Sequence, residues 1–304
     1  ERIISSHSIQ NNKCLTLLVE TVGSNEGVYC FSKNSITPEG KFQLSLVGRK
    51  IASTFSGFCS YHDQMIFECI DNNNFDFSAK QIFLYSYRAF AQSYHKNKEE
   101  LNGLSKDTSL KERFEESVVN EMIAGREIAC RDLEKYKLLF NDMLKEADYC
   151  QLDFYVYKKK GLYPVAASSS VNLPFTPSGV RNKFLSDISV ESPPMQIVVL
   201  PELDYTYVIL TCFRNDSFHR TFLNELRFNF ADSGWIENII SSLLVYEVEN
   251  TCISPYILKK MDDKEKEQLY IEIINSIDLP HDCLYFKQFR MSEINFFDRK
   301  FCKK

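Results

Sequence analysis

The stretch from about residue 110 to residue 147 constrains the fold more than any other, because its apolar residues keep a helical spacing throughout. They recur at steps of three, four and seven, namely Phe114, Val118, Met122, Ala129, Leu133, Tyr136, Phe140 and Leu144. Steps of this size place side chains on one side of an α-helix. A helix of about 35 residues, rising about 1.5 Å per residue, is about 50 Å long. We predict one long helix, whose charged remainder forms either a solvated face or a contact with a partner helix.

A second helix is predicted before it, from about Ser78 to Leu101. Its aromatic and aliphatic residues also keep a helical spacing. Ser78 is a suitable N-cap, because its side-chain oxygen can accept a hydrogen bond from a backbone N–H of the first turn. Residues 103–108 separate the two helices. We therefore expect residues 76–148 to form a helical hairpin or stalk.

The remainder of the chain, residues 149–304, is predicted to form a β-sheet flanked by helices. Residues 152–157 alternate between polar and apolar side chains, which predicts one strand. Two further segments have a clearer strand pattern, and the short connection between them predicts a hairpin. These two strands cover residues 195–200 and 205–213, after a Ser- and Pro-rich loop over 168–194. Helices are expected over 217–229, 234–248 and 255–276, and a last strand over 283–289.

The composition bounds the class of protein. Of the 304 residues, 44% are hydrophobic and 25% are charged, which is the balance of a globular chain. No uncharged apolar run approaches the roughly 18 residues that a membrane span needs, and the first residues lack the layout of a secretory signal. We therefore expect a cytoplasmic protein that does not contact a membrane. The ten cysteines are scattered, which favours reduced thiols over a disulfide framework.

The charge limits how the protein can bind nucleic acid. A formal net charge of -5 argues against non-specific coating of nucleic acid, which needs many Lys and Arg side chains on one face. Two dense basic segments remain, Lys158–Lys160 and the carboxy-terminal residues 299–304. Each is either a solvated segment or a local patch for nucleic acid.

The stretch from Cys59 to Asp71 gathers the side chains with the most varied chemistry. Cys59 and His62 are separated by two residues, a spacing that lets a tight turn direct two ligands at one zinc ion. The other ligands of such a site must come from elsewhere. Asp63 is either part of the site or the cap of a helix that begins near residue 64. Cys69 lies in an apolar run, which favours a place in the core.

The order of four side chains is similar to the HNH pattern of the ββα-metal nucleases. His7 comes first, Cys59 and His62 follow, and Asp71 comes last. The resemblance implies that His7 is the general base, that Cys59 and His62 bind a structural zinc ion, and that Asp71 binds a catalytic divalent metal such as Mg or Mn. Zinc-supported members of this class also carry a Cys pair upstream of the His. No Cys precedes His7 in this sequence, so that pair lies outside it or is absent.

A wider resemblance covers most of the chain. Residues 6–12, residues 57–67 and residues 249–255 are similar to a family of uncharacterised bacterial proteins, whose members carry Cys residues just upstream of the His. The resemblance implies an HNH-like, zinc-supported module over residues 1–75 and an association with phage defence. The pair Glu249-Asn250, which lies in the last of these segments, is also explained by the chemistry of a helix end.

We predict an α+β protein in three parts: the module over 1–75, the hairpin over 76–148 and the sheet domain over 149–304. Two functions stay open. The first is metal-dependent cleavage or binding of nucleic acid, with His7 as base. The second is a non-catalytic interaction subunit, stabilised by zinc, which docks a partner protein through its long helix and its carboxy-terminal domain. His7 is in that case a structural histidine.

Overall fold

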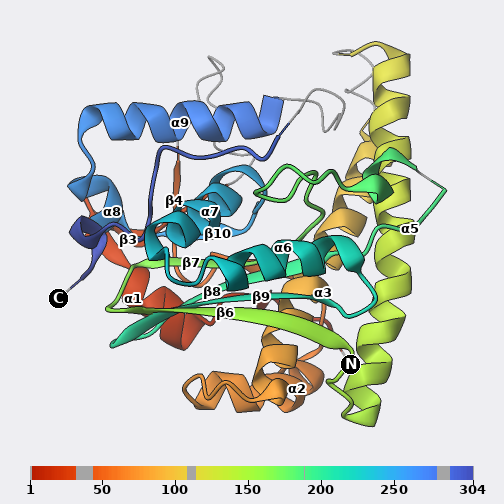
Figure 1. The fold of residues 1–304 in the computed structure, drawn as a ribbon, viewed down its shortest axis with the longest axis horizontal. Helices are drawn as coiled ribbons and strands as arrows, with labels where there is room; N and C mark the ends of the chain where they lie inside the picture. The colour runs from red at the N-terminus through yellow and green to blue at the C-terminus, as the bar shows by residue number, and fades with distance from the viewer. Residues whose placement is uncertain (1, 32–43, 108–113, 188, 279–287, 304) are drawn as a thin grey trace.

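An antiparallel sheet of eight strands runs through the middle of the computed structural model, which describes residues 2–31, 44–107, 114–187, 189–278 and 288–303 (Figure 1). In spatial order its strands are β2 (Glu20–Val22), β3 (Asn25–Cys30), β10 (Thr251–Ile253), β7 (Val165–Val171), β8 (Met195–Pro201), β9 (Tyr205–Phe213) and β6 (Leu152–Lys160), and β4 (Ser45–Val47) pairs with β3. Helices cover both faces of this sheet, so the predicted α+β class is confirmed.

The central strands are buried on both faces, and this explains their composition. Strand β8 is buried along its whole length, and β9 is buried from its second residue onward. Their near-continuous apolar runs are what a strand covered on both sides needs. The two strands pair in antiparallel register, with Val198 opposite Ile209, so the predicted hairpin is confirmed. Strand β6 ends the sheet and pairs with β9 alone among the described strands.

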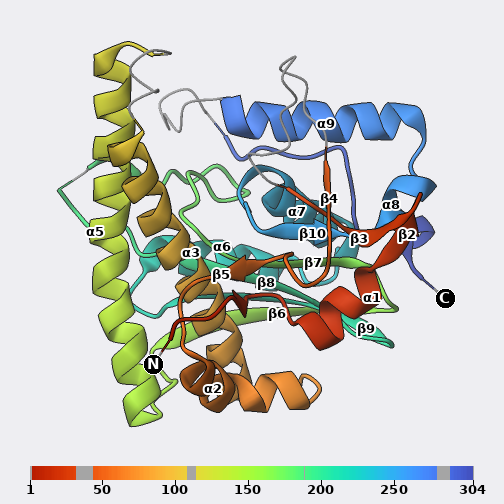
Figure 2. The same cartoon turned by 180° about the vertical axis from the view of Figure 1, so that it is seen from behind.

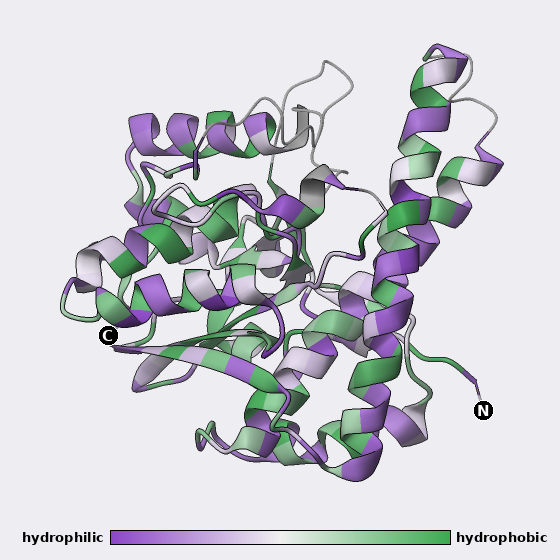
Figure 3. Cartoon of the chain, turned by 45° about the vertical axis from the view of Figure 1, so that its right-hand side comes forward, coloured by the Kyte–Doolittle hydropathy of each residue, from purple (hydrophilic) through white to green (hydrophobic). Residues whose placement is uncertain are grey.

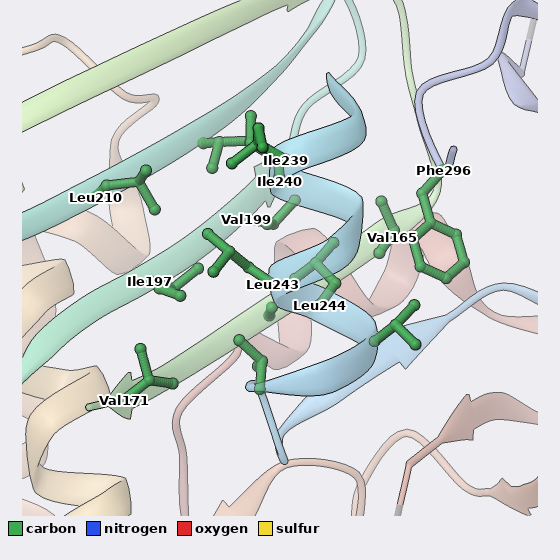
Figure 4. Close-up of a cluster of buried hydrophobic side chains, with 14 of the residues drawn as sticks. Val165, Val171, Ile197, Val199, Leu210, Ile239, Ile240, Leu243, Leu244 and Phe296 are labelled. Atoms are coloured by element: carbon green, nitrogen blue, oxygen red, sulfur yellow. The ribbon is translucent and has the colours of Figure 1, made fainter. Parts of the chain in front are cut away.

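One face of the sheet is covered by α6 (Ser217–Phe228) and α7 (Ser233–Tyr246). Figure 4 shows the apolar side chains of α7 lying on those of the strands, with α7 contributing Ile239, Ile240, Leu243 and Leu244 and the sheet contributing Val165, Val171, Ile197, Val199 and Leu210. Helix α9 (Asp263–Asp278) packs against α7. Side chains of this size each contribute roughly 1.5–3 kcal/mol when fully buried, so this layer is a main source of stability.

The opposite face carries α3 (Ala79–Lys106) and α5 (Glu116–Glu146), which form the predicted hairpin (Figure 2). Ser78 is the N-cap of α3, because its hydroxyl accepts a hydrogen bond from the Gln81 N–H at 3.2 Å. Residues 81–94 of α3 are buried between α5 and the sheet. The long helix begins at Glu116 rather than near residue 110, and residues 108–113 lie outside the described part of the chain.

The far end of this hairpin projects beyond the sheet (Figure 3). The predicted apolar stripe of α5 is therefore buried in the carboxy-terminal half of the helix and exposed in the amino-terminal half, where Val119 rather than Val118 is buried. Phe140 is fully buried, whereas Val118 and Met122 are 41% and 40% exposed. None of the helices that the structure describes combines the length and the apolar character that a membrane crossing requires.

The amino-terminal segment joins the same sheet as the carboxy-terminal segment. Strand β3 pairs with β10, and Tyr29 lies opposite Ile253. A separate two-stranded ladder joins β1 (Ser6–His7) to β5 (Thr54–Phe55), and α2 (Ser60–Asn72) follows it. The boundary expected at residue 75 therefore does not separate two sheets, because strands from residues 20–47 complete the sheet of residues 152–253.

Two expectations for the carboxy-terminal segment need correction. The single helix expected over 255–276 is two helices, α8 (Pro255–Lys260) and α9, because a capping box starts the second one. The Asp262 carboxylate accepts from the Glu265 N–H at 2.9 Å, and the Glu265 carboxylate accepts from the Asp262 N–H at 3.0 Å. Most of the strand expected over 283–289 lies outside the described residues, and residues 288–289 are not in a strand.

Candidate functional site

The amino-terminal segment passes α2 and α3 (Figure 2). Side chains from these three parts of the chain line a polar hollow of about 300 Å³. Three elements bring its side chains together. Strand β1 and the residues on either side of it contribute Ser5, His7, Gln10, Asn11, Asn12 and Lys13, while α2 contributes Asp63, Asp71 and Asn72, and α3 contributes Arg88. The structure thus brings together two of the predicted site residues, His7 and Asp71.

His7 is held at this hollow by the β1–β5 ladder, in which it lies opposite Thr54. Its Nε2 atom is 3.4 Å from the Arg49 carbonyl oxygen, which can only accept a hydrogen bond. In the neutral ring the proton is therefore on Nε2, and Nδ1 keeps its lone pair. Burial lowers the pKa of His7 below its ordinary value, against the opposing effects of the Arg49 carbonyl and of Asp63. A neutral imidazole at neutral pH is what a general base requires.

The residues after β1 form a five-residue π-helix, Asn11–Leu15. Its wider turn is closed by the Leu15 N–H, which donates to the Gln10 carbonyl at 3.0 Å. Such turns are rare and frequently occur at functional sites. Here the π-helix places Lys13 beside the end of α2, where its ammonium donates to the Ile70 carbonyl oxygen at 3.3 Å. Lys13 therefore brings a basic side chain to the hollow.

Arg88 and Asp71 form a bidentate ion pair at the base of the hollow. Each of the two guanidinium Nη atoms donates to one carboxylate oxygen at 2.8 Å. The guanidinium also lies 4.0 Å from the centre of the Phe67 ring, and Arg88 is only 3% exposed. Gln10 donates a further hydrogen bond to Asp71 at 3.3 Å. Both oxygens of Asp71 are therefore engaged with Arg88, so Asp71 holds a buried cation in place.

Asp63 lies in the first turn of α2 and lines the hollow, so of the two alternatives considered for it, the helix cap is not the one observed. The helix begins at Ser60 with Cys59 as its N-cap residue, and the Asp63 N–H donates to the Cys59 carbonyl at 2.9 Å. Burial raises the pKa of the Asp63 carboxyl, while the charge of Arg88 opposes this rise. A half-buried carboxyl with a raised pKa is typical of a functional site.

Several buried polar atoms at this hollow have no hydrogen-bond partner within the described ranges of the chain. They are one carboxylate oxygen of Asp63, the side-chain oxygen of Asn11 and the Nε atom of Arg88. A buried polar atom without a partner costs about 1–3 kcal/mol, so such atoms rarely gather at one place without a ligand or water to satisfy them. The hollow is therefore suited to a small polar group that both accepts and donates hydrogen bonds.

Asn250 supports the His7 segment from the main sheet. It precedes β10 directly, and its side-chain amide donates to the Ser8 hydroxyl at 2.8 Å, to the Ser53 hydroxyl at 3.2 Å and to the Ser168 carbonyl at 2.7 Å. Ser53 has a φ of 61°, a left-handed conformation that costs a residue other than Gly roughly 1–2 kcal/mol. Asn250 thus bridges two segments, and this is its role rather than the helix-end chemistry considered above.

The predicted zinc ligands Cys59 and His62 lie together but do not line the hollow. The Cys59 Sγ atom is 3.3 Å from Nδ1 of His62, and His62 is exposed. A structural zinc ion takes four ligands. In the part of the chain that the structure describes, no three His, Cys, Asp or Glu side chains are arranged so that they can hold a metal ion. The described residues therefore do not complete either metal site, and the zinc and the catalytic metal stay predictions.

The basic run Lys158–Lys160 lies at the end of β6, not in a loop. Lys158 places its ammonium 3.8 Å from the centre of the Tyr205 ring, and Lys159 pairs with Glu237. Charged side chains on the last strand of a sheet also prevent pairing with another chain. These contacts give the run a structural explanation that needs no nucleic acid.

The sequence prediction did not include Arg88, which proves central to the hollow. The sequence does contain a signal for it, because Arg88 is a charged residue within the aromatic run of α3, at a position that the helical spacing places on the buried side. A buried Arg almost always has a partner, and Asp71 was the nearest acidic candidate of the neighbouring helix. No family model, no curated protein and no solved structure matches this chain. The fold and the hollow therefore define it only as an α+β protein with a polar site beside β1.

Proposed function

We propose that the protein binds a phosphate ester of a nucleotide or of a nucleic-acid end in this hollow, and that His7 is the general base for its hydrolysis. The observation that carries the proposal is the meeting of a neutral His7 with Asp63 and the Arg88–Asp71 pair in one polar hollow. Lys13 contributes a basic side chain, and the amide NH2 groups of Asn11, Asn12 and Asn72 are donors for the ester oxygens. The oxygens of Asp63 and Asn11 that have no partner among the described residues accept from the attacking water.

The size of the hollow and the net charge of the chain narrow the substrate class. A volume of about 300 Å³ is at the small end of ligand pockets, which favours a mononucleotide or a strand end over a duplex. The net charge of -5 supports the same choice, since long nucleic acids need an extended basic surface. In the proposed reaction His7 Nδ1 takes a proton from the attacking water, and the hydrogen-bond donors of the hollow hold the phosphate oxygens.

The test is hydrolysis of bis(p-nitrophenyl) phosphate and of an end-labelled single-stranded oligonucleotide, with Mg²⁺ or Mn²⁺ added. His7→Gln is expected to lower kcat at least 100-fold, because general-base catalysis contributes roughly 10²–10⁴-fold. The matched control is Glu68→Gln, which removes an exposed charge from the outer side of α2 and is expected to change little. Equal activity of His7→Gln and the wild type would refute the role of His7.

The pH dependence gives an independent check. Burial lowers the pKa of His7 below its ordinary value, and only the neutral ring can accept a proton. The rate is expected to rise with pH through this pKa and to level off above it. A rate that keeps rising in proportion to hydroxide concentration through the alkaline range would assign the base to another group.

A second function has one specific observation in its favour, which is the open stripe at the projecting end of α5. Val118 and Met122 on α5, and Phe114 just before the helix, recur every four residues and are 40–47% exposed. Exposed acidic residues border them, including Glu115 and Glu121. We propose for this surface a partner helix with an apolar stripe and basic borders. Its test is binding of an amphipathic Leu/Lys peptide to wild type and to Val118→Asp, with loss of binding expected in the variant.

A further inference from the structure

Two cysteines face each other across neighbouring strands of the main sheet. Cys30 at the end of β3 lies directly opposite Cys252 in β10, and their Sγ atoms are 3.0 Å apart. The Phe31 N–H donates to the Thr251 carbonyl at 3.1 Å, so these next two residues form a hydrogen-bonded pair. Pairs alternate along an antiparallel ladder, which makes Cys30 and Cys252 a non-hydrogen-bonded pair.

This type of pair has the geometry that a disulfide needs. Opposite residues at non-hydrogen-bonded positions have Cα atoms about 4.5 Å apart, and disulfides span about 4.4–6.8 Å between Cα atoms. The two sulfurs are already in contact on the side of the sheet that faces α3. Both residues are held by their strands, so the sulfurs can bond without a rearrangement of the backbone.

The two thiols differ in access. Cys252 is completely buried, whereas Cys30 is half-buried and can be reached by a small oxidant. We propose that Cys30 and Cys252 are a redox modification site, at which hydrogen peroxide converts the two thiols into a cross-strand disulfide. Cys30 is the sulfur that meets the oxidant, and Cys252 is the resolving thiol.

The reaction balances with one peroxide. The Cys30 thiolate attacks one peroxide oxygen, the O–O bond breaks, and hydroxide leaves and takes up the proton of Cys30, so that Cys30 becomes a sulfenic acid. The Cys252 sulfur then attacks the Cys30 sulfur, the S–O bond breaks, and hydroxide leaves as water with the proton of Cys252. Two thiols are oxidised to one disulfide, and one peroxide is reduced to two waters.

The place of the pair gives the modification a structural consequence. Cys252 is two residues from Asn250, whose amide holds the hydroxyls of Ser8 and Ser53 next to His7. A disulfide would fix β10 to β3 and so fix the strand from which Asn250 supports the His7 segment. An effect of the disulfide on activity rests on the proposed function of His7. Formation of the disulfide does not, because it is measured directly.

The test is oxidation of the 304-residue protein by hydrogen peroxide, followed by denaturation, alkylation with N-ethylmaleimide and peptide mapping without reductant. We expect two of the ten thiols to escape alkylation and one linked pair of peptides that carries Cys30 and Cys252, reversed by dithiothreitol. Cys30→Ser is expected to abolish the linked pair. Cys252→Ala, which keeps an apolar side chain in the core, is expected to leave Cys30 as a sulfenic acid that reacts with dimedone.

The matched control is Cys150→Ser, since Cys150 is exposed and is not part of the pair. It is expected to leave the yield of the linked peptides unchanged. Oxidation that consumes Cys150 while Cys30 and Cys252 remain open to alkylation after denaturation would overturn the proposal. So would a thiol loss in Cys30→Ser equal to that of the wild type.

Discussion

We predict that substituting Arg88 and substituting Asp71, the two members of the ion pair, lower the free energy of unfolding by different amounts. Arg88→Met removes two hydrogen bonds of 2.8 Å but leaves an Asp71 side chain that is 40% exposed. Water can hydrate that carboxylate, so the expected loss of unfolding free energy is about 2 kcal/mol. Asp71→Ala instead leaves a guanidinium whose side chain is 4% exposed, and an unpaired buried charge costs about 3–5 kcal/mol.

Urea unfolding followed by the fluorescence of Trp235, the single tryptophan, measures both values. Trp235 is on α7, on the other side of the sheet from the mutated residues, so its signal reports global unfolding. The double variant is expected to lose less than the sum of the two single losses, because the residues share one interaction. Glu68→Gln should stay within about 0.5 kcal/mol of the wild type. An Arg88→Met loss that exceeds the Asp71→Ala loss would refute the reasoning.

Three further predictions concern the surroundings of the hollow. Because the pKa of Asp63 is raised in the folded protein, its charge destabilises the fold above that pKa, so Asp63→Asn should raise the melting temperature at pH 7 more than at pH 3. Asn250→Ala removes three hydrogen bonds, and a loss of about 2–3 kcal/mol in urea unfolding is expected, whereas no loss would contradict the bridging role. The Cys30–Cys252 disulfide, which joins residues 222 apart, should raise the unfolding free energy by about 5 kcal/mol relative to the reduced protein in the same assay.

The elements that were predicted correctly depend on local spacing. The apolar stripe of α5, the N-cap of α3 and the β8–β9 hairpin are each specified within a short stretch of sequence. The pairing of β3 with β10 joins residues more than 200 positions apart, and no local spacing reports such a contact. Strand β10 has only three residues, which is too short for an alternating pattern to identify it.

The candidate site was predictable only in part, because local sequence patterns identify single residues but not their contacts across the fold. His7 was singled out from its surroundings in sequence, and Asp71 from the order of the motif, but their meeting depends on the packing of α2 against α3. Arg88 carries the pair that connects these helices, and its role follows from its burial rather than from its neighbours in sequence. The zinc site at Cys59 and His62 was predicted from a resemblance. Among the described residues these two side chains are in contact, but no further ligand joins them.

The most direct test of the central claim is the ionisation of His7 with and without a phosphate ester. Nitrogen-15 NMR of the five histidine rings, titrated with a nucleoside monophosphate, measures both the tautomer and the effect of the ligand. The His7 ring is expected to be neutral at pH 7, to carry its proton on Nε2 and to shift on addition of the ester, while His7→Gln identifies its signal. A His7 ring that is charged at pH 7, or one that does not respond to the ester, would contradict the account.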